Sequence, residues 1–387
     1  MVELKDCMEE LLKFTLQSHI CRTLCLDFDL GISTDYCSAL LVEDENDLNA
    51  SPSPSSGSFE GVPRYPLYRR LAVALSEAIR SGMLSKKDEK TAFFDEENTI
   101  NQNGELDELI QQRGTELMNI LKTINFEIHV QEPFFTQLKD GQKTVEGRCA
   151  TGDYNHISTG AFILVNKCLV LEVQDVRKYA SFLEMLEGEG LSKVLPGVNT
   201  FEDGVQIYRR FYMEEKERDN GVLAIDILKS SHQPYISVAR IISVLGYNGV
   251  HNLLGLVHTA GTVSDSLPPP RSALLSALQQ PYNRDVKGST LTDGARALAK
   301  HFSRSSSKYW GSLDGSDSRK NKAAMDIITC LISSCCWLNL HVVPPHGVVF
   351  EIRDANGYGA RWSGDGSKFI GFLEPYMKDG HLRRWRH

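Results

Sequence analysis

The chain has 387 residues, of which 41% are hydrophobic and 24% charged, and its formal net charge is −8. This composition is ordinary for a globular protein, and the length predicts two to three domains. No run approaches the roughly eighteen apolar residues of a membrane span, and the first residues lack the pattern of a signal peptide. We therefore expect an intracellular protein, in the nucleus or the cytoplasm, with no membrane partner.

The charge is unevenly distributed along the chain. From Arg271 onward, 17 Lys and Arg residues stand against 10 Asp and Glu residues, so the last third is basic and the remainder acidic. A basic region of this kind attracts nucleic acid. The nine cysteines are scattered, without a Cys-x-x-Cys pair, and the histidines are dispersed, so we expect neither a metal nor another cofactor.

Residues 1–122 predict a helical region. Apolar residues recur at helical spacing near the start, in residues 65–83 and in residues 106–124. Two polar stretches, near residues 43–60 and 85–104, have the composition of linkers. These helices contain no candidate catalytic or ligand-binding residues, so we expect them to pack on the next domain or to bind a protein partner.

The most informative stretch is the octet Gly141-Gln142-Lys143-Thr144-Val145-Glu146-Gly147-Arg148. If it is extended, its period of two places Thr144, Glu146 and Arg148 on one face. An amine, a hydroxyl, a carboxylate and a guanidinium are costly to bury unpaired, so we expect them in a solvated cleft. A strand whose outer face is merely salt-bridged is the alternative.

Several separated blocks after the octet agree with one known domain. They are Tyr179-Ala180-Ser181-Phe182, Glu189-Gly190-Leu191, Val194-Leu195-Pro196-Gly197, Tyr208-Arg209-Arg210-Phe211-Tyr212 and Gly221-Val222-Leu223-Ala224-Ile225. Together with the octet, they resemble the activating signal cointegrator homology (ASCH) domain of the PUA-like superfamily, in a eukaryotic multi-domain form. The resemblance implies a small β-barrel with interposed helices, here within residues 123–248.

The expected fold class is α+β, with a helical region, an ASCH barrel and a basic α+β domain in series. After the barrel, Ile236 to Leu245 predicts one further strand. Residues 249–272, which include three consecutive prolines, predict a linker to the basic domain at 273–387. That domain resembles an uncharacterised eukaryotic family, which implies no activity. Its tryptophans beside cations suit base stacking, but we favour a tryptophan-rich core with the cations on the surface.

The resemblance implies nucleic-acid binding in a cleft of the barrel. There Lys143 and Arg148 would meet a phosphate or a base edge, with Thr144 and Glu146 beside them. The neighbouring Arg177, Lys178 and Tyr179 add two cations and a ring that could stack on a splayed base. Because a cleft suits unstacked bases better than a duplex groove does, we expect RNA or single-stranded nucleic acid, with RNA preferred.

Two alternatives stay open. Where hydrolysis is claimed for ASCH proteins, the resemblance points to Lys143 and Glu189 as catalytic residues. The enzyme would then be an amidohydrolase acting on a modified nucleoside such as acetylated cytidine, or a ribonuclease. Glu146 opposes that chemistry because a carboxylate beside Lys143 would hold the amine protonated, so we expect binding rather than catalysis. The second alternative is a transcriptional cointegrator-type scaffold that binds proteins through the N-terminal helices.

Overall fold

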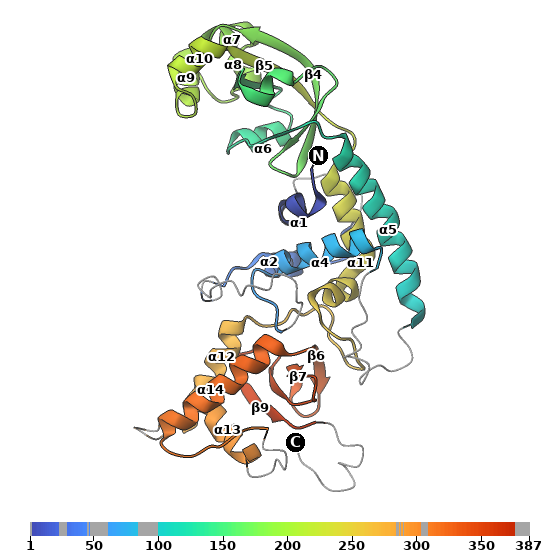
Figure 1. The fold of residues 1–387 in the computed structure, drawn as a ribbon, viewed down its shortest axis with the longest axis vertical. Coiled ribbons are helices and arrows are strands. Elements are labelled where there is room, and N and C mark those ends of the chain that lie inside the picture. The colour runs from blue at the N-terminus through green and yellow to red at the C-terminus, as the bar shows by residue number, and fades with distance from the viewer. Residues whose placement is uncertain are drawn as a thin grey trace. The chain divides into compact units, whose positions relative to one another are not determined.

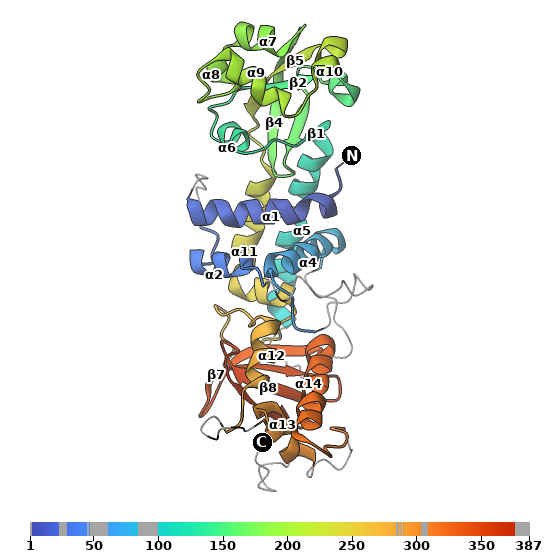
Figure 2. The same ribbon diagram turned by 90° about the vertical axis from the view of Figure 1, so that its left-hand side faces the viewer.

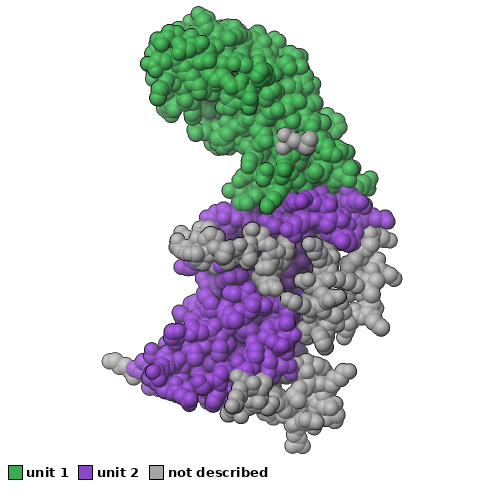
Figure 3. Space-filling view, viewed as in Figure 1, with its two compact units in different colours: residues 1–15, 112–240 green, residues 16–111, 241–387 purple. Residues whose placement is uncertain are grey.

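The computed structural model describes residues 2–22, 29–44, 46, 61–83, 100–283, 286, 288, 290–302 and 309–375. Figure 3 shows the two compact units of the chain: unit 1 comprises Met1–Thr15 and Gln112–Arg240, and unit 2 comprises Leu16–Gln111 and Ile241–His387. This division differs from the predicted domains, because the N-terminal helices contribute to both units. The linkers predicted near residues 43–60 and 85–104 lie largely outside the described residues.

Unit 1 contains a five-stranded sheet of order β1-β3-β4-β5-β2 (Figure 1). Its strands are β1 (Phe126–Ile128), β2 (Val145–Cys149), β3 (Phe162–Val165), β4 (Leu169–Tyr179) and β5 (Val222–Lys229). β1 pairs with β3 in parallel, and the other neighbouring strands are antiparallel. The sheet curls into a half-barrel, so the predicted mixed α+β class is confirmed.

Short helices connect these strands. They are α6 (Phe134–Lys139), η2 (Gly152–His156), α7 (Phe182–Glu189), α8 (Leu191–Val194), α9 (Phe201–Arg209) and α10 (Glu214–Asn220). α7 and α9 begin at capping side chains, because Ser181 and Thr200 each accept a hydrogen bond from the backbone N–H three residues later. Asn166 and Lys167 turn the β3–β4 hairpin with φ values of 48° and 59°, the left-handed region that a tight hairpin turn uses.

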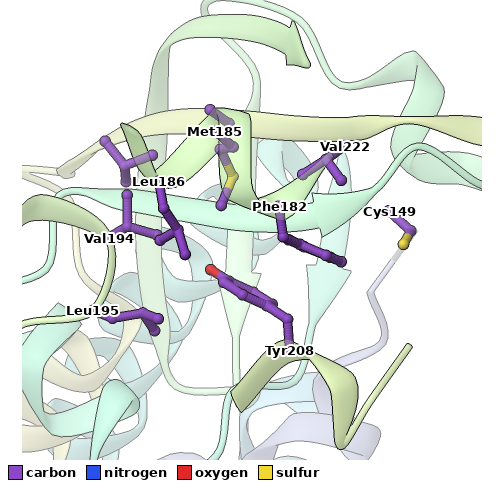
Figure 4. Close-up of a cluster of buried hydrophobic side chains, with 10 residues drawn as sticks. Cys149, Phe182, Met185, Leu186, Val194, Leu195, Tyr208 and Val222 are labelled. Carbon is purple, nitrogen blue, oxygen red and sulfur yellow. The ribbon is translucent and has the colours of Figure 1, made fainter. Parts of the chain in front are cut away.

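A hydrophobic core joins the helices to strands β2 and β5 (Figure 4). Its buried members are Val145, Cys149, Phe182, Met185, Leu186, Val194, Leu195, Tyr208, Val222 and Ala224. The rings of Phe182 and Tyr208 stack with centroids 4.1 Å apart. Gly147 of β2 makes this packing possible, because a Cβ at this position would lie 2.4 Å from the Tyr208 hydroxyl oxygen. The octet therefore contributes a glycine that lets α9 approach the sheet.

The remaining helices outside the C-terminal part are α1 (Leu4–Cys21), α2 (Thr34–Leu41), α4 (Leu67–Ser81), α5 (Ile100–Thr123) and α11 (Pro234–Leu254). α11 overturns the strand predicted over Ile236 to Leu245. Val238, Ile241, Ile242 and Leu245 are buried at the three- and four-residue spacing of a helix. A short, continuous apolar run fits a buried strand or a buried helix equally well, so periodicity alone misassigned it.

The C-terminal part of unit 2 combines helices with an antiparallel sheet (Figure 2). Its elements are α12 (Arg271–Gln279), α13 (Asp293–Phe302), α14 (Asp317–Ser334), β6 (Trp337–Val343), β7 (Gly347–Arg353), β8 (Gly359–Ser363) and β9 (Phe369–Leu373), with the strands in that order. Residues 257–263, expected in a linker, instead lie along β6: the Val257 and Val263 N–H groups donate to Leu338 and Leu340 carbonyls at 2.9 and 2.8 Å. In the described part of the chain, no helix has the length and hydropathy needed to cross a membrane.

Candidate nucleic-acid interface

The charged side chains of the octet bind one another. The Glu146 carboxylate lies 3.2 Å from Lys143 Nζ and 2.8 Å from Arg148 Nε. Glu146 and Arg148 share a face of β2, as the period of two predicts, and Lys143 reaches the same carboxylate from just before the strand. The three side chains form one ion-paired network, which is called the octet network below.

The octet network is enclosed, which corrects the expectation of a solvated cleft. Lys143 is 3% exposed and Glu146 is 6% exposed. The Lys143 ammonium also donates to the carbonyls of Val145, at 2.8 Å, and Val194, so all three of its protons have acceptors. Because every charge is paired, the cost of burial is offset, and neither Lys143 nor Glu146 is presented to a ligand.

The pKa values of the octet network follow from burial and pairing. Burial lowers the pKa of Lys143, and this outweighs the opposing effect of Glu146. Burial also raises the pKa of Glu146, but Lys143 and Arg148 together bring it below its ordinary value. Glu146 thus pairs with Lys143 as predicted, whereas the direction of the Lys143 shift is set by desolvation.

The octet network ties two distant segments to β2. Lys143 Nζ binds the Val194 carbonyl, and Arg148 Nη2 donates to the His129 carbonyl at 2.7 Å. The half-buried Thr144 adds a backbone bond, in which its N–H donates to the Lys193 carbonyl at 3.0 Å. The octet therefore positions the chain on either side of it, near residues 129 and 193–194.

These two segments lead directly into a pocket of about 690 Å³ in unit 1. Its lining comes from three separate parts of the chain: Gln131, Glu132, Pro133, Phe134 and Gln137; Pro196, Gly197 and Val198; Ile207, Arg210 and Phe211. Lys143 Nζ lies 5.8 Å from the centroid of the Phe134 ring, so the octet network sits beside the pocket wall. The octet builds this pocket, while other residues line it.

Gln137 offers an unused acceptor in this lining. Its Nε2 donates to the Pro196 carbonyl at 2.9 Å, and since a carbonyl only accepts, the Oε1 atom must face the other way. That Oε1 atom is buried and has no hydrogen-bond partner among the described residues. A buried polar atom without a partner is costly to the fold.

Arg210 and Phe211 supply a cation and an exposed ring at the pocket. Both follow α9 directly and are exposed, Phe211 by 48%. The sequence analysis did not identify Gln137, Arg210 or Phe211 as site residues. Arg210-Phe211, a cation next to an aromatic ring, was the available signal, but only the fold brings this pair beside Gln137.

A second group of predicted residues forms a separate cluster on β4 and α7. Glu189 accepts from Arg177 Nε and Nη2 at 2.6 and 2.7 Å, and from the Tyr179 hydroxyl at 2.7 Å. Arg177 also pairs with Asp175 and lies 3.7 Å from Asp226. The hydrogen bonds from Arg177 lower the pKa of Glu189, which favours its anionic form. Lys178, which lies between Arg177 and Tyr179 in the sequence, is exposed.

Lys143 and Glu189 thus belong to different networks. The hydrogen bonds and ion pairs of Lys143 are to Glu146, Val145 and Val194, whereas those of Glu189 are to Arg177 and Tyr179. A general base needs a lone pair that is free to accept the substrate proton. This arrangement therefore argues against hydrolysis by these two residues.

With this geometry in place, the class of the domain follows from comparison with known proteins. Residues 128–231 match the ASCH domain family. The chain therefore carries an ASCH domain, as the octet and the later blocks predicted, and an ASCH domain suggests RNA or another nucleic acid as partner.

Two solved structures resemble a part of the chain. The crystal structure of hypothetical protein PH0355 is 42% identical, with a TM-score of 0.27, and the match covers 27% of this chain and 98% of that one. The solution NMR structure of protein PF0455 from Pyrococcus furiosus is 44% identical, with a TM-score of 0.26, and the match covers 27% of this chain and 97% of that one. No curated protein matches the chain.

The C-terminal part matches a different family. Residues 280–374 match the CdiA C-terminal tRNase toxin domain. The comparisons do not show the predicted likeness of this part to an uncharacterised eukaryotic family. The matched residues comprise α13, α14 and the four-stranded sheet of unit 2.

Proposed function

We propose that this protein binds RNA and that its ASCH domain holds one unstacked nucleotide in the pocket lined by Phe134, Gln137, Arg210 and Phe211. The observation that carries the proposal is the pair Arg210 and Phe211, an exposed guanidinium and an exposed ring next to each other in the lining of that pocket. Single-stranded RNA presents unstacked bases that stack on aromatic rings, and its phosphates accept hydrogen bonds from guanidinium groups.

The rest of the lining fits a nucleotide. The rings of Phe134 and Phe211 offer surfaces on which a base stacks, and Arg210 offers a guanidinium to its phosphate. Because the domain is not basic overall, it is better suited to binding a short RNA element in a pocket than to contacting the phosphate backbone along its length. Of the residues proposed from the sequence, the exposed Lys178 could bind a neighbouring phosphate, whereas Lys143 and Glu146 act by holding the pocket together.

The test is the affinity of the full chain for a fluorescein-labelled single-stranded RNA of mixed sequence. Phe211→Ala and Arg210→Ala are compared with Phe201→Ala and Arg218→Ala, which alter exposed residues outside the pocket lining. Stacking contributes about 1–3 kcal/mol per base, so Phe211→Ala weakens binding about 5-fold to 150-fold. Equal affinity of the pocket variants and their controls, or no binding by the unaltered chain, contradicts the proposal.

RNA cleavage by unit 2 is a second candidate function. The match of residues 280–374 to a tRNase toxin domain favours it, and the basic charge of the last third would attract RNA. Under this candidate the ASCH domain selects an RNA that the C-terminal part then cuts. The scaffold alternative, with protein partners on the N-terminal helices, stays a prediction.

A further inference from the structure

The sheet β6–β9 is covered by helices on one face and carries a charged cluster, beside the buried Trp337 and Val349, on the other. Phe350 of β7 and Trp362 of β8 are fully buried on the side covered by helices, and the Trp362 indole N–H donates to the Leu274 carbonyl of α12 at 3.1 Å. Strand residues alternate between faces, so Glu351 and Arg361, which pair directly across β7 and β8, point to the opposite side. His341 and Arg353 share that face by the same alternation and register.

These four side chains form a cluster around one carboxylate. Glu351 Oε2 accepts from Arg361 Nε at 2.8 Å and Nη2 at 2.6 Å, and lies 3.4 Å from His341 Nε2. Glu351 Oε1 accepts from Arg353 Nε at 2.7 Å. The same Arg353 donates through Nη1 to the Gly357 and Glu374 carbonyls at 2.7 and 3.1 Å, so it is held rigidly.

The cluster carries more positive charge than its carboxylate needs. Glu351 is buried, and its pKa is lowered to about 2 by His341 and the two guanidinium groups despite the opposing effect of burial, so it stays anionic at neutral pH. Two guanidinium groups against one carboxylate leave a net charge of +1 without counting His341. The side chains of His341 and Arg361 are each 16% exposed, so the surplus charge reaches the surface.

We propose that this cluster is an RNA-cleaving site in which His341 takes the proton of a ribose 2′-hydroxyl and Arg361 binds the adjacent phosphate. The 2′-oxygen then bonds to phosphorus as the bond from phosphorus to the 5′-oxygen breaks. The 5′-oxygen leaves as a hydroxyl with a proton from solvent, and His341 returns its proton to solvent. The products are a 2′,3′-cyclic phosphate and a 5′-hydroxyl end.

The geometry gives each residue one part in this step. An N–H on His341 Nε2 faces the Glu351 carboxylate, which leaves the lone pair of Nδ1 as the base. Glu351 and Arg353 are positioning residues, because Glu351 orients His341 and Arg353 fixes Glu351. Arg361 uses its Nε and Nη2 edge on Glu351, and its Nη1 N–H groups remain for the non-bridging phosphate oxygens. The inference rests on the second candidate function and names its site.

The experiment incubates the full chain with end-labelled deacylated tRNA, with and without EDTA. His341→Ala is compared with His346→Ala, which alters an exposed histidine in the β6–β7 turn of the same sheet. Loss of a general base costs about 10²–10⁴ in rate, so His341→Ala should lose cleavage to that extent while His346→Ala keeps it. The fragments should end in a cyclic phosphate, and EDTA should leave the rate unchanged.

Two further variants separate a folding effect from a chemical one. His341→Asn retains a polar side chain toward Glu351, so it should unfold like the unaltered chain and still fail to cut. Arg361→Lys keeps the charge but loses the paired N–H geometry and should be slowed. Cleavage by His341→Ala within tenfold of the control, fragments with a 3′-hydroxyl, loss of activity in EDTA, or no cleavage by the unaltered chain overturns the inference.

The ASCH pocket is tested separately in the same assay. If Phe211→Ala weakens RNA binding but leaves cutting of excess tRNA dependent on His341, both proposals stand. If RNA binds through the pocket and is never cut, the cleavage site fails while the proposed RNA binding survives. If cutting depends on His341 but the pocket variants have no effect on RNA binding, the proposed pocket fails while the cleavage site survives.

Discussion

Replacing Lys143 should destabilise the ASCH domain rather than remove a contact with RNA. In Lys143→Ala the buried Glu146 carboxylate keeps only Arg148, and the carbonyls of Val145 and Val194 lose a donor. Breaking a buried ion pair from one side costs about 3–5 kcal/mol, because a buried charge is left without its partner. We expect the free energy of unfolding of unit 1 to fall by about that amount.

The positions of the tryptophans allow this loss to be assigned to unit 1. All four tryptophans lie at or after Trp310 in the sequence, within unit 2. Hydrogen-exchange mass spectrometry in urea can follow peptides of β2 and β5, while tryptophan fluorescence follows unit 2 in the same samples. Protection in β2 and β5 should fall at lower urea in Lys143→Ala, and the fluorescence transition should not move.

Lys193→Ala is the matched control, since this lysine is exposed and its backbone carbonyl, which the substitution keeps, accepts from the N–H of Thr144 next to Lys143. The control should leave both transitions in place. A Lys143→Ala protein with unchanged protection in β2 and with lost RNA affinity would refute the reasoning. It would show that Lys143 meets the ligand, as the sequence first suggested.

Two further predictions concern packing and pH. Gly147→Ala forces a Cβ against the Tyr208 hydroxyl and the Met185 thioether, so it should destabilise unit 1 by about 1–3 kcal/mol in the same exchange measurement. Gly371→Ala in β9 of unit 2 adds a Cβ with no atom within 4 Å, so it should leave the tryptophan fluorescence transition of unit 2 in place; comparable losses of stability in both variants would contradict the packing argument. Burial, with His258 nearby, lowers the pKa of His251 to about 4 from an ordinary value of 6.5, so the unfolded chain binds this proton more readily. The neutral His251 therefore contributes its full share to the free energy of unfolding of unit 2 above pH 6.5. That free energy should decrease by about 3 kcal/mol as the pH falls toward 4. Urea unfolding by tryptophan fluorescence checks this, and a pH slope that persists undiminished in His251→Gln would exclude His251 as its source.

Much of the ASCH fold could be read from local sequence. The octet showed that Glu146 and Arg148 share a face, since alternation along a strand is a local property. The β3–β4 hairpin is a local feature too, because Asn166, a residue type that tolerates positive φ, lies at its turn. These features depend on residues within a few positions of one another, so one sequence is enough to find them.

What only the tertiary structure decided is which polar groups are buried and which meet solvent. Lys143 looked like a ligand-binding amine, but the carbonyl of Val194, 51 residues away, closes over it. Gln137 and Phe211 come from segments more than seventy positions apart, and their common pocket exists only after α9 packs on β2. The cluster around Glu351 likewise depends on the register of β6, β7 and β8. Strand pattern sets the face on which a side chain lies, whereas its burial, pairing and charge depend on partners that distant parts of the chain supply.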